Sequence, residues 1–208
     1  MKVVVVAVHP DDETLACGGT LLKHRSQGDE INWIITTGAM IPEIPVVRDM
    51  FAFNNTILMD LPETKLDQYP FGRIISLFSE IFNDIKPDII YLPFKGDVHS
   101  DHQVIFRAAY SCTKSFRYPF IKKVLMMETI SETDFAPALS ENAFLPNLYV
   151  DITDYQERKK EILNVYSSEL GVHPFPRTLE NIDALAHWRG SQAGVNYAEC
   201  FMILKLIQ

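Results

Sequence analysis

The chain has 208 residues, of which 47% are apolar and 22% charged, as expected of a globular protein with a buried core. Its formal net charge of -8 argues against nucleic acid or an anionic membrane surface as the main partner, because both favour a basic face. No segment approaches the roughly 20 apolar residues that span a bilayer, so we expect no membrane span. Because no repeat or low-complexity linker interrupts residues 1–208, we expect a single domain.

The cysteines and the N-terminus favour a cytoplasmic setting. Cys17, Cys112 and Cys200 lie far apart, and no C-x-x-C pair occurs that would indicate a structural zinc site. An odd number of cysteines gives no disulfide framework, which fits a reducing compartment. The six apolar residues Val3–Val8 are followed by "HPDD", whereas the apolar region of a signal peptide needs about 7–15 residues.

Short apolar runs alternate with helical patterns through the first two thirds of the chain. Each run is apolar on both faces, which is typical of strands in a parallel sheet that is covered on both sides. The alternation therefore predicts a doubly wound α/β fold, with a mostly parallel sheet and helices on both faces. The predicted strands are Val3–Val8, Ile31–Thr36, Asn55–Met59, Asp88–Leu92 and Lys123–Met127, and the predicted helices are Thr14–Gln27, Phe71–Ile85 and Gln103–Phe116.

The last third of the chain has a different pattern. Asp154–Tyr166 is predicted to form a charged helix, and Gly171–Arg177, "GVHPFPR", a loop that contains two prolines. Leu179–Trp188 has a helical pattern, and Glu199–Leu206 is expected to form a final strand.

Two polar clusters follow two of the predicted strands. In open α/β sheets, ligands bind at the carboxyl ends of the strands, so topology alone places both clusters on the same edge. A single capping group would satisfy each strand-to-helix turn, yet each cluster holds four ionisable side chains. The first cluster consists of His9, Asp11, Asp12 and Glu13, and the second of Asp97, His99, Asp101 and His102.

These residue types indicate metal-assisted hydrolysis. Two histidines and one carboxylate are a usual catalytic zinc set, and a bound zinc lowers the pKa of water to ~7. The carboxylates and the histidine that remain could act as general base and acid. A purely structural alternative also exists, in which Asp12 or Glu13 stabilises a helix dipole and Asp97 or Ser100 caps the next helix.

Three motifs resemble those of the PIG-L (LmbE-like) deacetylases. "AVHPDDETLACGGTL" resembles the opening A-H-P-D-D-E…G-G-x-L of that family, and "HSDH" resembles its H-x-D-H motif. "RGSQAGVNYAECF" is similar to the G-x-x-x-G-x-x-x-A-E-x-F near the C-terminus of many members. The motifs occur in the family's order and span residues 7 to 201, nearly the whole chain.

The resemblance implies a Rossmann-like fold and hydrolysis of an N-acyl group, here an N-acetyl group, from a small amino-sugar substrate or a conjugate of one. It also implies a divalent cation, usually Zn²⁺, with Fe²⁺ or another divalent ion possible. Members often form homo-oligomers. By residue, the resemblance makes His9, Asp12 and His102 the metal ligands, Asp11 the general base, His99 the oxyanion stabiliser and acid, and Asp101 the carboxylate that orients His99 and favours its imidazolium form.

Substrate contacts are expected from two further regions. Arg48 matches an Arg that the family often carries on the active-site side, but Phe51 stands where a Glu often follows that Arg. His173 and Arg177 could reach over the site from the proline-containing loop. Glu199, the Glu of A-E-x-F, is expected to have a structural or supporting role.

Three alternatives to a deacetylase are open to the sequence. Two histidines and a carboxylate also form the facial triad of non-haem Fe(II) enzymes, although the βα alternation disfavours the barrel on which that triad usually lies. A metal-binding or sugar-binding module without deacetylase activity is the second alternative. A dinucleotide-binding oxidoreductase is disfavoured, because Gly18 and Gly19 lie inside a predicted helix and no G-x-G-x-x-G occurs.

Overall fold

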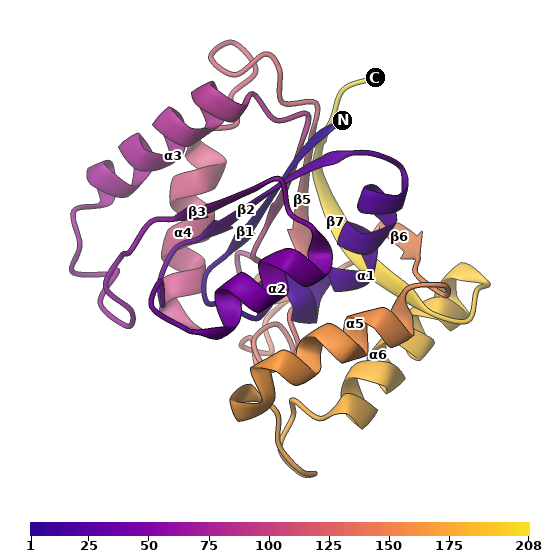
Figure 1. The fold of residues 1–208 in the computed structure, drawn as a ribbon. Helices are drawn as coiled ribbons and strands as arrows, with labels where there is room; N and C mark the ends of the chain where they lie inside the picture. Colours follow the sequence, from indigo (N-terminus) through magenta and orange to yellow (C-terminus); the bar gives the residue numbers. More distant parts are fainter.

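The computed structural model describes residues 1–208, and its centre is a seven-stranded sheet in the order β3-β2-β1-β4-β5-β7-β6 (Figure 1). Strands β1 to β5 run parallel to one another, whereas β7 is antiparallel to both β5 and β6. The strands are β1 (Lys2–Ala7), β2 (Glu30–Ile35), β3 (Asn55–Leu58), β4 (Ile89–Leu92), β5 (Lys123–Met127), β6 (Leu148–Asp151) and β7 (Ala198–Leu206).

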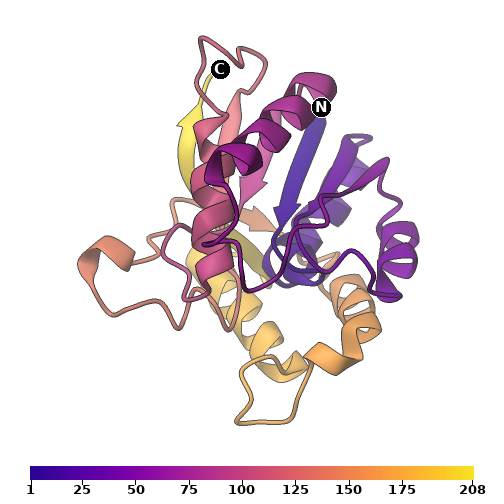
Figure 2. The ribbon, with the colours of Figure 1, turned by 90° about the vertical axis from the view of Figure 1, so that its left-hand side faces the viewer.

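Helices cover both faces of this sheet, which confirms the predicted fold class (Figures 1 and 2). Helices α3 and α4 pack on one face, and α1, α2 and α5 pack on the other. Helix α6 lies against β7 and β6. The helices are α1 (Asp12–Ser26), α2 (Glu43–Phe51), α3 (Phe71–Ile85), α4 (Ser100–Ser111), α5 (Gln156–Leu163) and α6 (Leu179–Ala193), and two 3₁₀ turns are η1 (Ser140–Asn142) and η2 (Asn164–Glu169).

The valines of β1 explain why this strand lies at the centre of the sheet. Successive side chains of a strand point to opposite faces, so Val4 and Val6 enter the core under α3 and α4. Val3 and Val5 enter the core under α1 and α2. All four are fully buried, and β1 delivers the residues that follow it to a fixed point at the carboxyl edge of the sheet.

Two elements were not predicted from the sequence, and two predicted helices end earlier than expected, one of which, predicted over Gln103–Phe116, is α4 (Ser100–Ser111). Helix α2 has Pro45 in its first turn and only nine residues, so its helical pattern is weak. Strand β6 is a short edge strand with partly exposed side chains. The helix predicted over Asp154–Tyr166 ends at Leu163 and continues as the 3₁₀ turn η2.

None of the helices combines the length and the apolar character that crossing a membrane requires. The three cysteines are free and buried.

Candidate active site

A polar cavity of about 160 Å³ lies where the carboxyl ends of β1 and β4 meet the loops around them. One of its eleven lining residues is hydrophobic, and five carry carboxylates. Both sequence clusters contribute to it, as the sheet topology predicts. The lining residues are His9, Pro10, Asp11, Asp12, Gly38, Ile41, Glu63, His99, Glu132, Glu169 and Arg177.

The turn from β1 into α1 fixes the carboxylate of Asp12. Its Oδ2 atom accepts hydrogen bonds from the backbone N–H groups of Val8 (2.9 Å) and His9 (2.8 Å). The preceding residue, Asp11, has a φ of 129°, a backbone conformation that costs a non-glycine residue roughly 1–3 kcal/mol. The Asp11 N–H donates to Oε2 of the buried Glu13 at 3.2 Å, so side chains of the turn hold this strained backbone in place.

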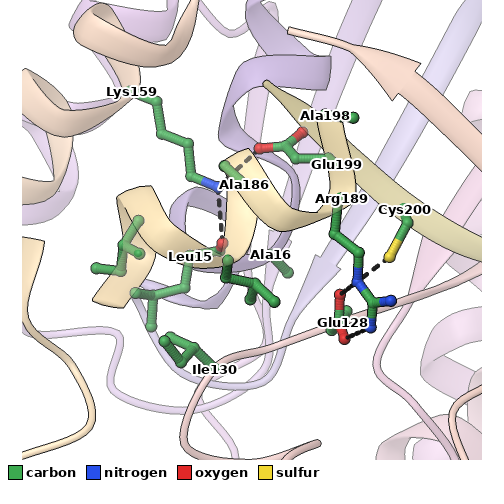
Figure 3. A pocket seen from close by; sticks show the side chains of 12 residues that line it. Leu15, Ala16, Glu128, Ile130, Lys159, Ala186, Arg189, Ala198, Glu199 and Cys200 are labelled. Atoms are coloured by element: carbon green, nitrogen blue, oxygen red, sulfur yellow. Dashed lines mark hydrogen bonds and ion pairs between the residues drawn. The ribbon is translucent and has the colours of Figure 1, made fainter. Parts of the chain in front are cut away.

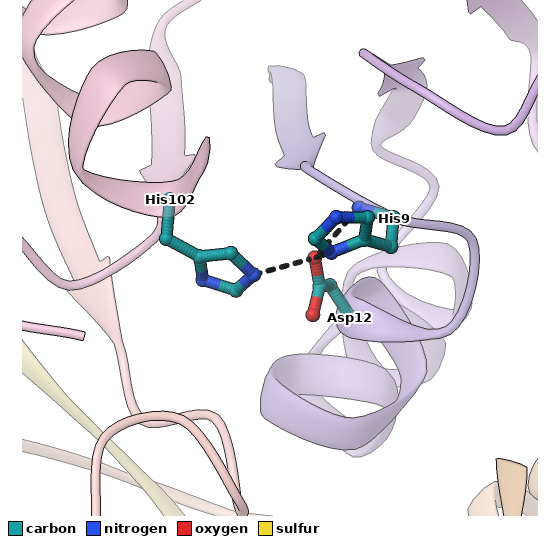
Figure 4. A group of neighbouring side chains, drawn as sticks. All are labelled: His9, Asp12 and His102. Atoms are coloured by element: carbon teal, nitrogen blue, oxygen red, sulfur yellow. Dashed lines mark hydrogen bonds and ion pairs between the residues drawn. The ribbon is translucent and has the colours of Figure 1, made fainter. Parts of the chain in front are cut away.

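His9, Asp12 and His102 converge on one point (Figure 4). One potential ligand atom from each lies within 4.8 Å of the other two. Nε2 of His102 is 3.3 Å from Oδ2 of Asp12, and Nδ1 of His9 is 3.8 Å from the same oxygen. His9 comes from the end of β1, Asp12 from the first turn of α1 and His102 from the first turn of α4.

The surroundings of His102 fit a metal ligand. The ring is completely buried, its Nδ1 lies 2.8 Å from Oδ2 of Asp97, and its Nε2 has no hydrogen-bond partner. Buried polar atoms rarely lack a partner, and metal-ligating histidines usually have their second nitrogen on a carboxylate. Nε2 of His9 is also buried and makes no hydrogen bond, but it lies 3.8 Å from Oδ2 of Asp101, whereas Nδ1 of the same ring is the nitrogen 3.8 Å from Asp12.

The charges of these residues depend strongly on one another. Burial alone would raise the pKa of Asp12, but the neighbouring imidazoles of His102 and His9 lower it below its usual range. Burial opposes charge on His102, yet Asp12 and Asp97 raise its pKa well above the usual value. The protein without a cation therefore keeps a proton on His102 between two carboxylates, and a metal ion would displace that proton.

Asp97 has a role that the sequence did not assign to it. It is fully buried, its Oδ2 faces His102, and its Oδ1 accepts a hydrogen bond from the hydroxyl of Thr133 at 2.6 Å. Asp97 was one of eight candidate ligands and also a candidate helix cap. Asp97 lies five residues before His102, in the polar cluster that follows β4. This spacing is the sequence signal that could have indicated a carboxylate that orients His102.

The arrangement of His99 and Asp101 differs from the sequence-based expectation. The Asp101 carboxylate accepts from the backbone N–H of Thr64 at 2.7 Å, and only the backbone N–H of Asp101 bonds to Nδ1 of His99, at 3.1 Å. Burial lowers the pKa of His99, His9 adds to that effect, and Asp101 opposes it. The Asp101 carboxylate makes no hydrogen bond to the His99 ring and favours the imidazolium form through its charge alone, so its orienting role stays a prediction. Because Nδ1 accepts a hydrogen bond, the neutral His99 ring carries its proton on Nε2.

Asp101 also belongs to a second group that could hold a cation, with His9 and His99. The Asp101 oxygen nearest to His9, at 3.8 Å, is held by a single backbone donor, the N–H of Thr64. In the group of His9, Asp12 and His102, a carboxylate contacts Nδ1 of His102 and orients the ring, and two backbone N–H groups donate to Asp12. The donor set of His9, Asp12 and His102 is therefore the better prepared of the two.

Arg177 reaches the site from the segment before α6. Its Nη1 lies 3.0 Å from Oδ2 of Asp11 and 3.4 Å from Oε2 of Glu169, and its buried Nε has no partner. Burial raises the pKa of Asp11 well above its usual value, Asp12 adds to that effect, and Arg177 opposes it. The guanidinium group thus favours the charged form of Asp11.

The other two predicted substrate residues lie elsewhere. Arg48 is exposed on α2, where its side chain pairs with Asp49 at 2.8 Å, and it does not line the cavity. His173 lines a different surface cavity beside η2. Conversely, the loops supply Glu63, Glu132 and Glu169, which no sequence motif indicated.

Glu13 connects the first motif to the C-terminal third. It is completely buried, and burial raises its pKa to about 7. Its Oε1 accepts hydrogen bonds from the hydroxyl groups of Thr14 (2.5 Å) and Tyr166 (3.2 Å). Tyr166 lies in η2, 153 residues away in the sequence, so local patterning could not indicate this contact.

The fold and the paired polar turns define the class to which the protein belongs. The model of the PIG-L family, described as GlcNAc-PI de-N-acetylase, matches residues 4–44 and 43–113, more than half of the chain. The chain therefore belongs to the PIG-L family, and its sheet with helices on both faces agrees with the resemblance that the motifs show.

Several solved structures share the fold at low sequence identity. The conserved protein TT1542 from Thermus thermophilus is 22% identical, with a TM-score of 0.78 over 99% of this chain and 96% of that one. The N,N'-diacetylchitobiose deacetylase from Pyrococcus horikoshii is 19% identical, with a TM-score of 0.78 over 98% and 84% of the chains. GalB, the 4-carboxy-2-hydroxymuconate hydratase from Pseudomonas putida, is 14% identical, with a TM-score of 0.73 over 100% and 97%. Because one neighbour is a hydratase, the fold alone does not identify the reaction.

Proposed function

We propose that the protein is a divalent-metal-dependent hydrolase that removes the N-acetyl group from an N-acetylated amino sugar or from a conjugate of one. The observation that carries the proposal is the convergence of His9, Asp12 and His102, with no hydrogen bond to the buried Nε2 of His102, beside Asp11 and His99. Membership of the PIG-L family supports the same reaction class.

His9, Asp12 and His102 are the residues that would hold the cation, for which we propose Zn²⁺. When bound, a divalent cation polarises a carbonyl oxygen and lowers the pKa of water. The two backbone donors on Asp12 and the carboxylate behind His102 fix these ligands before a cation arrives. Orientation of ligands in advance is how surrounding residues usually raise metal affinity.

Asp11 and His99 divide the proton chemistry in this proposal. The Asp11 carboxylate, whose charged form Arg177 favours, removes a proton from the attacking water as the new C–O bond forms. Nε2–H of His99 donates a hydrogen bond to the acyl oxygen as negative charge develops there. When the C–N bond breaks, the protonated Asp11 returns its proton to the amine, so that the products are acetate and a free amino group.

The lining of the cavity supports a hydroxyl-rich substrate with a short acyl group. Carboxylates accept hydrogen bonds from sugar hydroxyl groups, and the Nε–H group of Arg177 has no partner in the protein and can donate to a substrate. Ile41 is a hydrophobic contact for a methyl group, but the cavity offers no apolar wall for a long acyl chain. Five carboxylates against one guanidinium disfavour a polyanionic substrate such as the carboxylated compound in the name of the hydratase neighbour.

The test is an amine-release screen. Protein stripped with a chelator and reloaded with one equivalent of Zn²⁺ is incubated with N-acetylglucosamine and with its glycosides, phosphates and disaccharides. We expect one acetate for each amine from at least one neutral sugar, and release about 10²- to 10⁴-fold slower from Asp11→Asn protein. Anaerobic loading with Fe²⁺ and an oxygen electrode test the oxygenase alternative. Metal binding without acetate release from any substrate would support a binding module instead.

Residence in the cytoplasm and assembly into homo-oligomers remain predictions.

A further inference from the structure

Helix α1, which carries the metal ligand Asp12, is broken in the middle. Cys17 has a φ of -144° and a ψ of 21°, outside the helical region, so the helix consists of two segments. A break of this kind leaves backbone N–H groups without partners at the start of the second segment and carbonyl groups without partners at the end of the first. The break lies about 8 Å along the helix from Asp12, at 1.5 Å per residue.

Glu199 on β7 caps the second segment. Its Oε1 accepts from the backbone N–H of Gly19 at 2.9 Å, and its Oε2 accepts from that of Thr20 at 2.7 Å. A carboxylate at a helix N-terminus is favourable for both its hydrogen bonds and its charge. A residue larger than glycine does not fit at position 19, because a Cβ atom there would lie 2.8 Å from the side chain of Ile152.

Lys159 on α5 holds the end of the first segment. Its Nζ donates to the backbone carbonyl of Leu15 at 2.9 Å and to Oε1 of Glu199 at 2.8 Å (Figure 3). The side chains of Lys159 and Glu199 are both only 4% exposed. The backbone N–H of Leu15 donates to the backbone carbonyl of Asp11 at 2.8 Å, so the residue that Lys159 contacts also bonds to the backbone of the proposed base.

We propose that the buried Lys159–Glu199 pair is a positioning device, which sets the geometry of α1 so that Asp11 and Asp12 are held in place for the cation. This inference rests on the proposed function. It gives one physical reason for two sequence motifs that lie 180 residues apart, the G-G in the first helix and the A-E-x-F in the last strand.

Fold stability alone is a weak explanation for this pair. Two buried charges lose much of their hydration energy, and apolar residues of similar volume often stabilise a protein as well or better. A short polar side chain could cap the second segment without burying a charge. What the pair adds is a fixed distance between two helix segments, since the Glu199 carboxylate bonds to the second segment, the Lys159 ammonium group bonds to the first, and the two groups bond to each other.

A second cavity, which Lys159 and Glu199 line and which Figure 3 shows, contains a matched control. Arg189 pairs with Glu128 in a second ion pair of low exposure, also drawn in Figure 3. The Glu128 carboxylate contacts Arg189 and the thiol of Cys200, and it accepts no hydrogen bond from α1. Loss of the Glu128 charge should therefore weaken the fold without displacing Asp11 or Asp12.

The experiment compares Zn²⁺ affinity, by competition with a chromophoric chelator, with the melting temperature of the metal-free protein. We expect Glu199→Gln and Lys159→Met to weaken Zn²⁺ binding about tenfold or more, as for other residues that orient ligands. Glu128→Gln should lower the melting temperature by a similar amount and leave the Zn²⁺ affinity within about twofold. The double variant Lys159→Met/Glu199→Gln has no unpaired buried charge, so it should regain stability but not affinity.

Two results would overturn the inference. One is wild-type Zn²⁺ affinity in all three variants of the Lys159–Glu199 pair. The other is an affinity that follows the melting temperature across every variant, Glu128→Gln included, because the pair would then act only through the fold. If a single variant does not fold, the double variant decides between these results. A wild-type protein that binds no divalent cation would instead refute the proposed function, and this inference with it.

Discussion

The part of the chain that the family model matches and the part that follows it contribute differently to the site. Residues 4–113 contain every proposed metal ligand and both proton-transfer residues. The later residues contribute groups that hold or surround this set, namely Lys159, Glu199, Tyr166, Glu169 and Arg177. The difference shows that the reactive groups and their nearest partners are specified by short local motifs, whereas further support comes from contacts across more than 100 residues.

The largest expected effect is a loss of Zn²⁺ affinity, on substitution of a proposed metal ligand within residues 4–113. His102→Ala removes a ligand from the centre of the proposed set, so it should weaken Zn²⁺ binding by more than the 10–100-fold typical of supporting residues. Circular dichroism should show an intact fold, because the site lies at the edge of the sheet. Metal analysis after gel filtration is the measurement, and full Zn²⁺ occupancy in this variant would remove His102 from the ligand set.

Asp11→Asn separates the base from the ligands. An amide cannot accept the proton, so kcat should fall by about 10²- to 10⁴-fold, the usual range for general base catalysis. Its metal content should be unchanged, whereas Asp12→Asn should lose metal. The opposite pattern, with metal lost from Asp11→Asn and kept by Asp12→Asn, would show that we have exchanged the two roles.

The pH dependence of the free energy of unfolding tests the contact between Glu13 in the first part of the chain and Tyr166 in the second. The pKa of Glu13 is about 7 in the folded protein and near 4.5 when unfolded, so the unfolded chain ionises first as pH rises. Stability from this group is therefore complete below pH 4.5 and is lost as pH rises through 7, by about 3 kcal/mol in all. Urea unfolding of metal-free protein at pH 5 and pH 8 should show this loss relative to Glu13→Gln. A difference between the two proteins that does not change with pH would contradict the burial of a neutral Glu13.

The smallest effect is expected on the substrate side. Arg177→Met should lower kcat/KM by about tenfold, because a hydrogen bond to a charged group contributes roughly 1.5–3 kcal/mol. Arg48→Met is the matched control: Arg48 is exposed beside Asp49, outside the cavity, so its loss should leave kcat/KM unchanged. Equal losses in the two variants would restore the prediction that Arg48 contacts the substrate.

The same comparison explains what could be predicted from the sequence. The βα alternation predicts the sheet, and the rule for carboxyl edges brings His9 and His102 together without any knowledge of packing. The family resemblance proposes their roles. Two hydrogen bonds could not be predicted in this way, because they depend on how segments distant in the sequence fold over the carboxyl edge of the sheet. They are the bond from the Thr64 N–H to Asp101 and the bond from the Tyr166 hydroxyl to Glu13.

At Arg48 the family resemblance and the structure differ. The resemblance placed it on the active-site side, but α2, which the sequence did not reveal, presents it to solvent beside Asp49. Its neighbour Phe51, where the family often has a Glu, is buried in the core against α1 and β2. The departure from the family pattern at Phe51 was therefore the better guide to the structure than the match at Arg48.

The proposed function depends on metal-dependent removal of an acetyl group at the convergent set of His9, Asp12 and His102. It can be tested by acetate and amine release from an N-acetylglucosamine conjugate by protein that has been stripped of metal and titrated with Zn²⁺. We expect no turnover without metal, full turnover at one equivalent, and one acetate for each amine. Undiminished turnover by the stripped protein, or release by the metal-loaded His102→Ala variant at the wild-type rate, would contradict it.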